Sequence, residues 1–174
     1  MTTWVLFAGL PGTGKSTLAR AMAERLGAAV LDKDRVRGAL FPGALTDYTA
    51  EQDQLCMRSM LDAAAYLTER GRADYIFFDG RTFSTRAQMQ QVLLAAERAG
   101  VRWRILHLTC ADEVAEARLA RKDPSHPAQN RDPGLYRTIK RHFEPILEAK
   151  LEIDTTSGIE GQLAVVEGYL RDAE

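Results

Sequence analysis

The sequence predicts a doubly wound α/β domain, and two observations support this prediction. First, five short apolar runs rich in β-branched and aromatic residues alternate with segments of helical periodicity. Second, the chain has 174 residues, which suits one domain with one sizeable core. Because parallel neighbouring strands need crossover connections, this alternation indicates a parallel sheet covered by helices on both faces. We therefore expect a single domain over residues 1–174.

The apolar runs are the predicted strands, and the segments between them carry the predicted helices. The strands are expected at Thr3–Ala8, Ala28–Leu31, Tyr75–Phe78, Val101–Leu108 and Leu151–Ile153. Apolar residues recur at the i, i+3, i+4, i+7 spacing of one helix face in three further segments, Cys56–Leu67, Met89–Ala96 and Ile159–Leu170. Strands and helices thus follow one another along the chain.

Helix starts are predicted from residues that satisfy free backbone N–H groups. Thr49, Thr109 and Ser157 are each followed three positions later by an acidic or amide residue, which is the capping-box pattern. Asp132 precedes a proline and predicts a further N-cap with proline at the first helical position. Four helix starts are expected at these residues.

Charge and cysteine usage limit the class of protein. The formal net charge of −1 argues against a large sequence-independent nucleic-acid interface, which requires a basic excess. The chain has two cysteines, Cys56 and Cys110, and neither a secretory signal pattern nor a twenty-residue apolar span. We expect a cytoplasmic protein without a membrane segment, with both cysteines in the core. The sequence leaves the oligomeric state open.

The strongest motif is the segment GLPGTGKST, which lies between the first strand and a helix. Gly9, four residues and then Gly14-Lys15-Ser16 match the Walker A spacing. Glycines let consecutive N–H groups surround phosphate oxygens, and the following helix presents its positive dipole end. Lys15 is expected to reach the β- and γ-phosphates of ATP, and the Ser16 hydroxyl to bind Mg²⁺. The predicted nucleotide-binding residues of this loop are Gly9, Pro11, Gly12, Thr13, Gly14, Lys15, Ser16 and Thr17.

Two observations favour a small kinase among the nucleotide-binding proteins. The chain lacks the Asn-Lys-x-Asp guanine-binding motif of GTPases and the Leu-Ser-Gly-Gly-Gln signature of transporter ATPases. It is also shorter than a usual motor ATPase. These absences and the chain length predict phosphoryl transfer to a separate acceptor.

Acidic residues follow the second and third strands, where ligands bind in parallel sheets. Asp34 is the candidate general base for an acceptor hydroxyl, and Arg37 the candidate ligand of an anionic or polar acceptor group. Asp79 ends the YIFFD run and is expected either to orient Mg²⁺ or to contact the acceptor. Arg81 extends into the same cleft. The arginines here, with Arg86, favour an acceptor that already carries negative charge.

Basic residues gather after the fourth strand. Arg118 and Arg121 lie three apart on one helix face, and the polar segment Lys122–Gly134 follows as a predicted mobile loop. We expect a lid over about residues 118–137 that brings arginines onto the phosphates of ATP.

These motifs resemble those of one family. The segments GLPGTGKST, LDKDRVR, FFDGRTFSTR and EARLARK are similar to the P-loop small-kinase group that contains polynucleotide 5′-hydroxyl kinases and adenylylsulfate kinases. The resemblance covers Trp4 to about Ile153. It implies a five-stranded parallel sheet in the order 2-3-1-4-5 with a helical lid, Asp34 as base, and Thr155–Gly158, including Thr156, beside the adenine.

Three functions remain open at this point. The first is an ATP- and Mg²⁺-dependent kinase of a small-molecule or nucleotide hydroxyl. The second is a kinase of 5′-hydroxyl nucleic-acid ends, against which the near-neutral charge weighs. The third is a regulatory ATPase without an acceptor, against which an aspartate at the position of Asp34 weighs.

Overall fold

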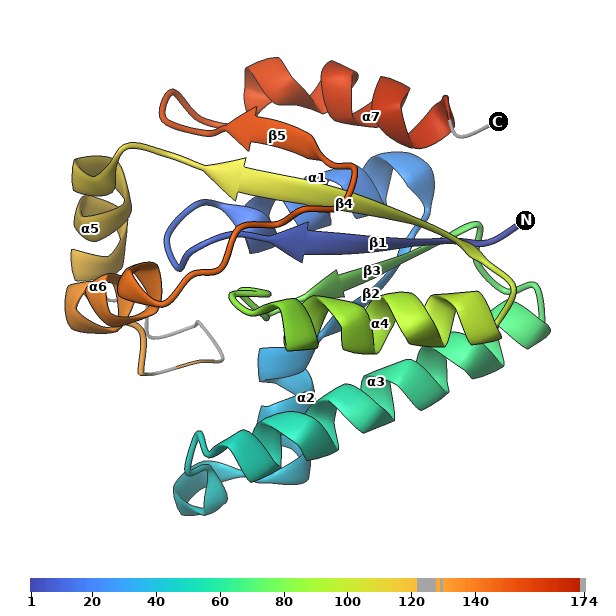
Figure 1. Ribbon diagram of the computed structural model, residues 1–174, viewed down its shortest axis with the longest axis horizontal. Coiled ribbons are helices and arrows are strands. Elements are labelled where there is room, and N and C mark those ends of the chain that lie inside the picture. The colour runs from blue at the N-terminus through green and yellow to red at the C-terminus, as the bar shows by residue number, and fades with distance from the viewer. Residues whose placement is uncertain (122–127, 129, 173–174) are drawn as a thin grey trace.

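Five parallel strands form one sheet in the order β2-β3-β1-β4-β5 (Figure 1). A computed structural model of the chain describes residues 1–121, 128 and 130–172. The strands are β1 Thr3–Ala8, β2 Ala29–Asp32, β3 Tyr75–Asp79, β4 Arg102–Thr109 and β5 Leu151–Asp154. The predicted fold class and the strand order implied by the resemblance are therefore confirmed.

Four of the strands extend one residue further toward their C-terminal ends than the sequence predicts. As a result, Asp32, Asp79 and Asp154 are the last residues of β2, β3 and β5. Asp32 and Asp79 are also paired in register between β2 and β3. Backbone pairing between neighbouring strands thus continues past the apolar runs to their polar last residues.

Helices cover both faces of the sheet, which gives two separate cores. The helices are α1 Lys15–Leu26, α2 Lys33–Leu40, α3 Ala50–Glu69, α4 Arg86–Arg98, α5 Asp112–Ala120, α6 Pro133–Arg141 and α7 Leu163–Arg171, with short 3₁₀ turns at Gly43–Leu45 and Glu160–Gln162. Figure 1 shows α3 and α4 on one face, and α5 and α6 beyond the C-terminal ends of the strands.

The central strand β1 divides the two cores by simple alternation of its side chains. Trp4 and Leu6 pack with α3 and α4, whereas Val5 and Phe7 pack with α1 and α7. All six β1 residues are buried. Because successive side chains of a strand point to opposite faces, this uninterrupted apolar run is what a doubly covered strand requires.

Two of the four predicted helix caps are confirmed. The Thr49 hydroxyl accepts a hydrogen bond from the backbone N–H of Gln52 at 3.3 Å. The Asp132 carboxylate accepts one from the N–H of Leu135 at 2.7 Å, with Pro133 at the start of α6. The hydroxyl of Thr49 and the carboxylate of Asp132 therefore mark real helix starts.

The two caps predicted at Thr109 and Ser157 are wrong. Thr109 is still part of β4, and α5 begins after Ala111 without a side-chain cap. Ser157 precedes Gly158, whose φ of 102° turns the chain, and the next helical turn starts after Ile159. At both places the strand or turn geometry takes precedence over the local capping pattern.

The remaining predictions concern the cysteines, the membrane and the lid. Cys56 is buried, and Cys110 is half-buried against a small cluster between α5 and α6. Within residues 1–121, 128 and 130–172, no helix combines the length and the apolar character needed to cross a bilayer. Most of the predicted loop Lys122–Gly134, and with it the middle of the predicted lid, lies outside the described residues.

Replacement of Gly9 tests how closely the loop after β1 packs on the sheet. Gly9 has a φ of 138°, and a Cβ there would lie 2.2 Å from the carbonyl oxygen of Leu108 in β4. We expect Gly9→Ala to lower the free energy of unfolding in urea by about 1–3 kcal/mol, because backbone cannot yield as a side chain can. Gly168→Ala in α7 is the control, since no atom lies within 4 Å of the added Cβ. It should raise stability by roughly 0.5–1 kcal/mol.

Candidate functional site

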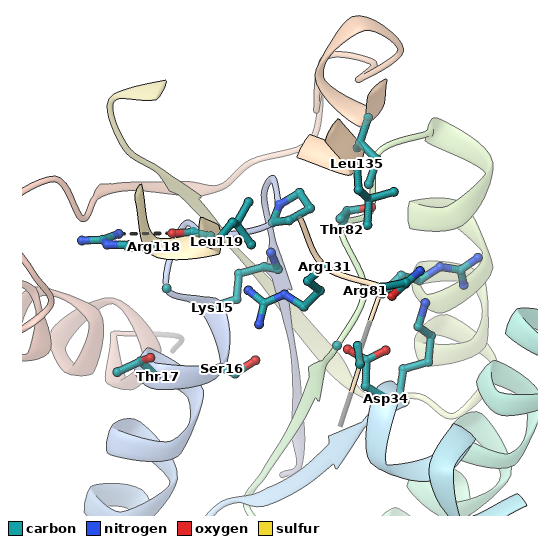
Figure 2. Close-up of a pocket in the computed structure, with 18 of the residues that line it drawn as sticks. Lys15, Ser16, Thr17, Asp34, Arg81, Thr82, Arg118, Leu119, Arg131 and Leu135 are labelled. Carbon is teal, nitrogen blue, oxygen red and sulfur yellow. Dashed lines mark hydrogen bonds between the residues drawn. The ribbon is translucent and has the colours of Figure 1, made fainter. Parts of the chain in front are cut away.

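A pocket of about 640 Å³ lies at the C-terminal ends of the strands, where Figure 2 shows residues of α1, α2, α5 and α6 meeting. Ligands bind at this end of open parallel sheets. Six residues of the predicted phosphate loop line it, namely Pro11, Gly12, Gly14, Lys15, Ser16 and Thr17. Gly9 and Thr13 instead shape the loop, Gly9 by its close approach to β4 and Thr13 by a hydrogen bond to the Leu10 carbonyl at 2.8 Å.

The phosphate loop presents both a fixed cation and the start of a helix to the pocket. Gly14 is the N-cap of α1, with φ 87° and no capping side chain, so the first N–H groups of α1 are left to a ligand. The Lys15 ammonium donates to the carbonyls of Gly9 at 2.9 Å and Leu10 at 2.7 Å, which holds it across the loop. Burial lowers the pKa of Lys15 to about 8. The loop has the groups that bind phosphate oxygens.

Ser16 and Asp79 form a donor pair suited to a metal ion. Asp79 is only 2% exposed at the end of β3. Burial raises the pKa of its carboxyl, and the neighbouring Ser16 side chain offsets part of this rise. Its Oδ1 atom is buried and has no hydrogen-bond partner in the described part of the chain. An unused carboxylate oxygen beside a hydroxyl fits Mg²⁺, which binds one or two protein oxygens together with substrate phosphates.

Asp34 lies in the first turn of α2 and lines the same pocket (Figure 2). The Asp32 carboxylate caps this helix by accepting from the N–H of Asp34 at 2.9 Å. Gly80, directly after β3, lets the two segments approach closely, since a Cβ there would lie 2.9 Å from the Asp34 nitrogen. Burial raises the pKa of Asp34 to about 6, although Lys33 and Arg37 lower it. Asp34 is therefore a carboxylate held in place whose pKa is close to neutrality.

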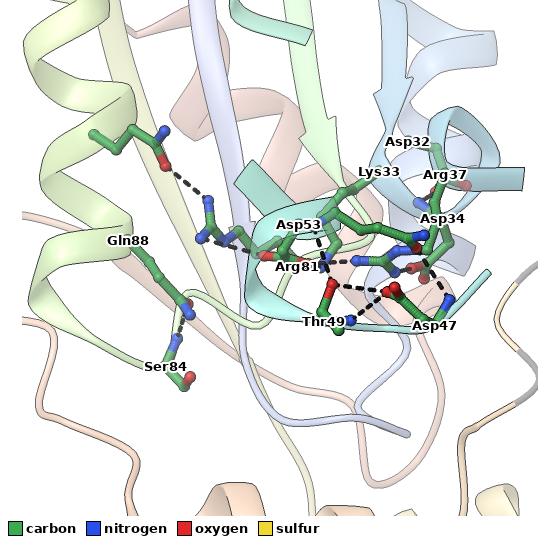
Figure 3. Close-up of polar contacts among 12 residues, drawn as sticks. Asp32, Lys33, Asp34, Arg37, Asp47, Thr49, Asp53, Arg81, Ser84 and Gln88 are labelled. Carbon is green, nitrogen blue, oxygen red and sulfur yellow. Dashed lines mark hydrogen bonds and ion pairs between the residues drawn. The ribbon is translucent and has the colours of Figure 1, made fainter. Parts of the chain in front are cut away.

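Arg37 and Arg81 also line the pocket, but both are bound by an aspartate that the sequence did not single out (Figure 3). The Asp53 carboxylate lies 2.5 Å from Arg37 and 3.3 Å from Arg81, and it is paired with Lys33. Arg86, expected on the same side, is exposed and is not part of the pocket lining. Both pocket arginines are thus paired with a carboxylate within the protein.

Asp53 could not be distinguished by local sequence. It is an acidic residue in the first turn of α3, a common placement that favours any helix through its dipole. Burial raises its pKa, but the ion pair with Lys33 and the charges of Arg81 and Arg37 bring the pKa below the usual value. The carboxylate therefore stays ionised, and its role arises from tertiary packing of α3 beside the strand ends.

The lid arginines have different positions. Arg118 is held by the Gly12 carbonyl at 3.3 Å, the Thr155 hydroxyl at 3.1 Å and the Thr155 carbonyl at 2.7 Å. Arg121, at the end of α5, is exposed and lines the pocket. Arg131, which the sequence placed only in a polar loop, also lines the pocket, and its charge contributes to lowering the Lys15 pKa. The end of the pocket beside α5 thus carries three arginines.

Two basic residues of α6 and the predicted site residue Thr156 make contacts within the framework. Arg137 pairs with Glu116 through two bonds of 2.7 Å, and Lys140 pairs with Asp112, so both join α6 to α5. Thr156 is hydrogen-bonded to the Asp154 carboxylate and the Ala111 N–H and does not line the pocket. Its predicted place beside adenine stays a prediction.

The fold and the site together define an α/β P-loop NTPase. The sheet order, a phosphate loop between β1 and α1, and a buried aspartate ending β3 are the features of this class. A model of the AAA_33 family, described as an AAA domain, matches residues 5–146. The chain belongs to this family. No curated protein sequence matched the chain.

Solved structures with the same fold include three that span nearly the whole chain. The APS kinase CysC of Mycobacterium tuberculosis, in complex with AMPPNP and APS, has a TM-score of 0.71 at 19% identity, covering 98% of both chains. Kti12 of Chaetomium thermophilum, in complex with ADP-AlF3, has a TM-score of 0.71 at 16% identity, again covering 98% of both. A gluconokinase of Sinorhizobium meliloti 1021 has a TM-score of 0.68 at 15% identity, covering 97% of this chain and 91% of its own. At these identities the likeness establishes the fold.

Removal of the Asp53 charge tests the ion-pair cluster. Asp53→Asn leaves three buried or half-buried cations without their shared counter-ion, and the Asp53 side chain is only 18% exposed. We expect a loss of about 2–3 kcal/mol in urea unfolding at pH 7. Because the folded pKa of Asp53 is depressed, its contribution is present above the unfolded pKa of about 4 and is lost as pH falls through the folded value.

The control is Glu51→Gln in the same helical turn, whose side chain is exposed. It should change stability by no more than about 0.5 kcal/mol. Equal stability of the two variants would contradict the role of Asp53.

Proposed function

We propose that this protein is a Mg·ATP-dependent kinase that transfers the γ-phosphoryl group of ATP to a hydroxyl of a small-molecule or nucleotide acceptor. One observation carries the proposal: the Asp34 carboxylate and the phosphate-binding loop line the same pocket from opposite sides (Figure 2). A regulatory ATPase has no need of a fixed carboxylate opposite the phosphates, whereas a kinase needs a base there.

The nucleotide half of the proposed site consists of the loop Gly9–Thr17 and the lid. Lys15 and the first N–H groups of α1 would bind the β- and γ-phosphates, and Ser16 and Asp79 would hold Mg²⁺. When bound, this ion neutralises phosphate charge. Arg121 and Arg118 are proposed to stabilise the transferring phosphoryl group, with Arg118 also fixing α5 to the loop.

The transfer step follows from the position of Asp34. Its carboxylate accepts the proton of the acceptor hydroxyl as the hydroxyl oxygen forms a bond to the γ-phosphorus. The bond between that phosphorus and the β–γ bridging oxygen breaks, and ADP leaves with the electron pair. The Asp32 cap keeps Asp34 at the pocket wall during this step, and Gly80 leaves room for it there.

The acceptor classes can be separated by one assay. Labelled ATP is offered with 5′-hydroxyl oligonucleotides and, separately, with a metabolite library, and ADP release is followed in both. We expect transfer to small molecules. Stimulation by oligonucleotides alone would instead support an end-specific polynucleotide kinase, and ADP release that no acceptor changes would support a regulatory ATPase.

The unpaired cysteines are in keeping with a reducing compartment, so the cytoplasm is the proposed location.

The phosphate loop is tested by Lys15→Ala. Loss of the ammonium removes the charge that spans the loop, and we expect ATP turnover, measured as ADP release, to fall by at least about 100-fold. Lys150→Ala is the matched control, because Lys150 contacts Ile146 and Glu152 away from the pocket. Full turnover in the Lys15 variant would remove the phosphate loop from the mechanism.

Asp34 is tested through pH. A base must be deprotonated, so kcat/KM for the acceptor should rise about tenfold per pH unit below pH 6 and level off above it, given the pKa of about 6. Asp34→Asn should bind ATP normally and lose acceptor phosphorylation by roughly 10²–10⁴-fold. Asp62→Asn, exposed on α3, is the control. An unchanged pH profile in the Asp34 variant would assign the base to another group.

A further inference from the structure

A second cleft of about 660 Å³ adjoins the phosphate pocket between the start of α3 and the start of α4. Tyr48, Asp53 and Arg81 line both spaces. The Asp53–Arg81 ion pair therefore forms their common wall. An acceptor with its reacting hydroxyl at Asp34 can extend along this wall into the second cleft.

The second cleft is lined mainly by uncharged hydrogen-bonding side chains. Five of its residues are glutamines or threonines, namely Thr49, Gln54, Thr85, Gln88 and Gln91. Among its described lining residues the charged ones are Asp53 and Arg81, which form an ion pair at 3.3 Å. A lining of this kind has groups for hydroxyls or amides, and its one cation is already paired.

Hydrogen bonds fix which way the amides of this cleft point. The Gln91 side-chain oxygen accepts a hydrogen bond from Arg81 at 2.9 Å. Its Nε2 group donates to the side-chain Oε1 atom of Gln54, also at 2.9 Å. Gln88 accepts from the Ser84 N–H at 3.0 Å (Figure 3). The Nε2 groups of Gln54 and Gln88 form no hydrogen bond within the described chain, and both are left as donors for the oxygens of a ligand.

The net charge at the inner end of the cleft also favours an uncharged ligand over an anion. Lys33, Arg37 and Arg81 are three cations, but Asp53 and Asp34 lie among them and leave at most one net positive charge. A second anion beside Asp53 would be repelled by its carboxylate and would have to displace ion pairs already formed. An uncharged acceptor meets neither cost.

We propose, building on the proposed kinase activity, that the acceptor is an uncharged polyhydroxyl compound whose distal hydroxyls bind Gln54 and Gln88 in the second cleft. Asp53 acts as the built-in counter-ion that excludes acceptors with several negative charges. This assignment reverses the anionic acceptor that the arginine-rich sequence had favoured, because those arginines are bound by Asp53.

The acceptor class is tested with matched neutral and anionic compounds. Phosphorylation from labelled ATP is measured with sorbitol against gluconate, glucose against glucuronate, and ribose against ribose 5-phosphate. We expect kcat/KM to be at least about tenfold higher for the neutral member of a phosphorylated pair. Asp53→Asn should reduce this preference. Preference of the wild-type protein for the anionic members would overturn the inference.

The cleft itself is tested by glutamine variants. Gln54→Leu and Gln88→Leu should raise the KM for the neutral acceptor about tenfold while the KM for ATP changes less than twofold, since each variant removes an amide donor to an acceptor oxygen. Gln90→Leu is the matched control on α4, because Gln90 bonds to Glu148 outside the cleft. An acceptor KM that stays at the wild-type value in both cleft variants would overturn the assignment.

The outcomes separate this inference from the kinase activity. Transfer to anionic compounds or to oligonucleotides, with none to the neutral panel, would leave the kinase proposal in place and refute the neutral acceptor. ATP binding with no transfer to any class would refute both. Neutral transfer that depends on Gln54 and Gln88 supports both.

Discussion

The wall between the two clefts depends on one carboxylate. Asp53 is paired with Lys33, Arg37 and Arg81, which come from the start of α2 and the chain just after β3. Three cations with little solvent access need a shared anion to remain charged and close together. Through these pairs α3 is tied to α2 and to the end of β3, and the wall between the two clefts is formed. Asp34 is linked to this carboxylate through Arg37, which lies 3.2 Å from Asp34 and also pairs with Asp53 in the next helix.

Local chemistry explains what the sequence could predict. The phosphate loop is one continuous segment, and Lys15 bonds to carbonyls within it. Its role could therefore be predicted from Gly9–Thr17 without knowledge of the fold. Asp79 was readable because it ends an apolar run, and parallel strand ends meet at one edge. The strand order itself came from the resemblance, since alternation alone predicts a parallel sheet but not its arrangement.

The sequence could not predict which acidic residue pairs with each basic residue. Arg37 and Arg81 look like free cations until α3 places Asp53 between them, and an acid in a first helical turn is too common to stand out. Thr109 and Ser157 matched capping boxes, yet backbone pairing in β4 and the turn at Gly158 decided those segments. For Arg37, Arg81 and Thr109 a contact between distant segments outweighed the local preference, whereas at Ser157 a neighbouring turn did so.

Thr155 joins three parts of the nucleotide side through one residue. Its hydroxyl donates to the Thr13 carbonyl at 2.8 Å and accepts from Arg118, while its own carbonyl accepts from Arg118 as well. The phosphate loop, the segment after β5 and the last turn of α5 are thereby joined through one side chain and its own carbonyl. A substitution at Thr155 would therefore disturb the phosphate loop and α5 together, although the two lie far apart in the sequence.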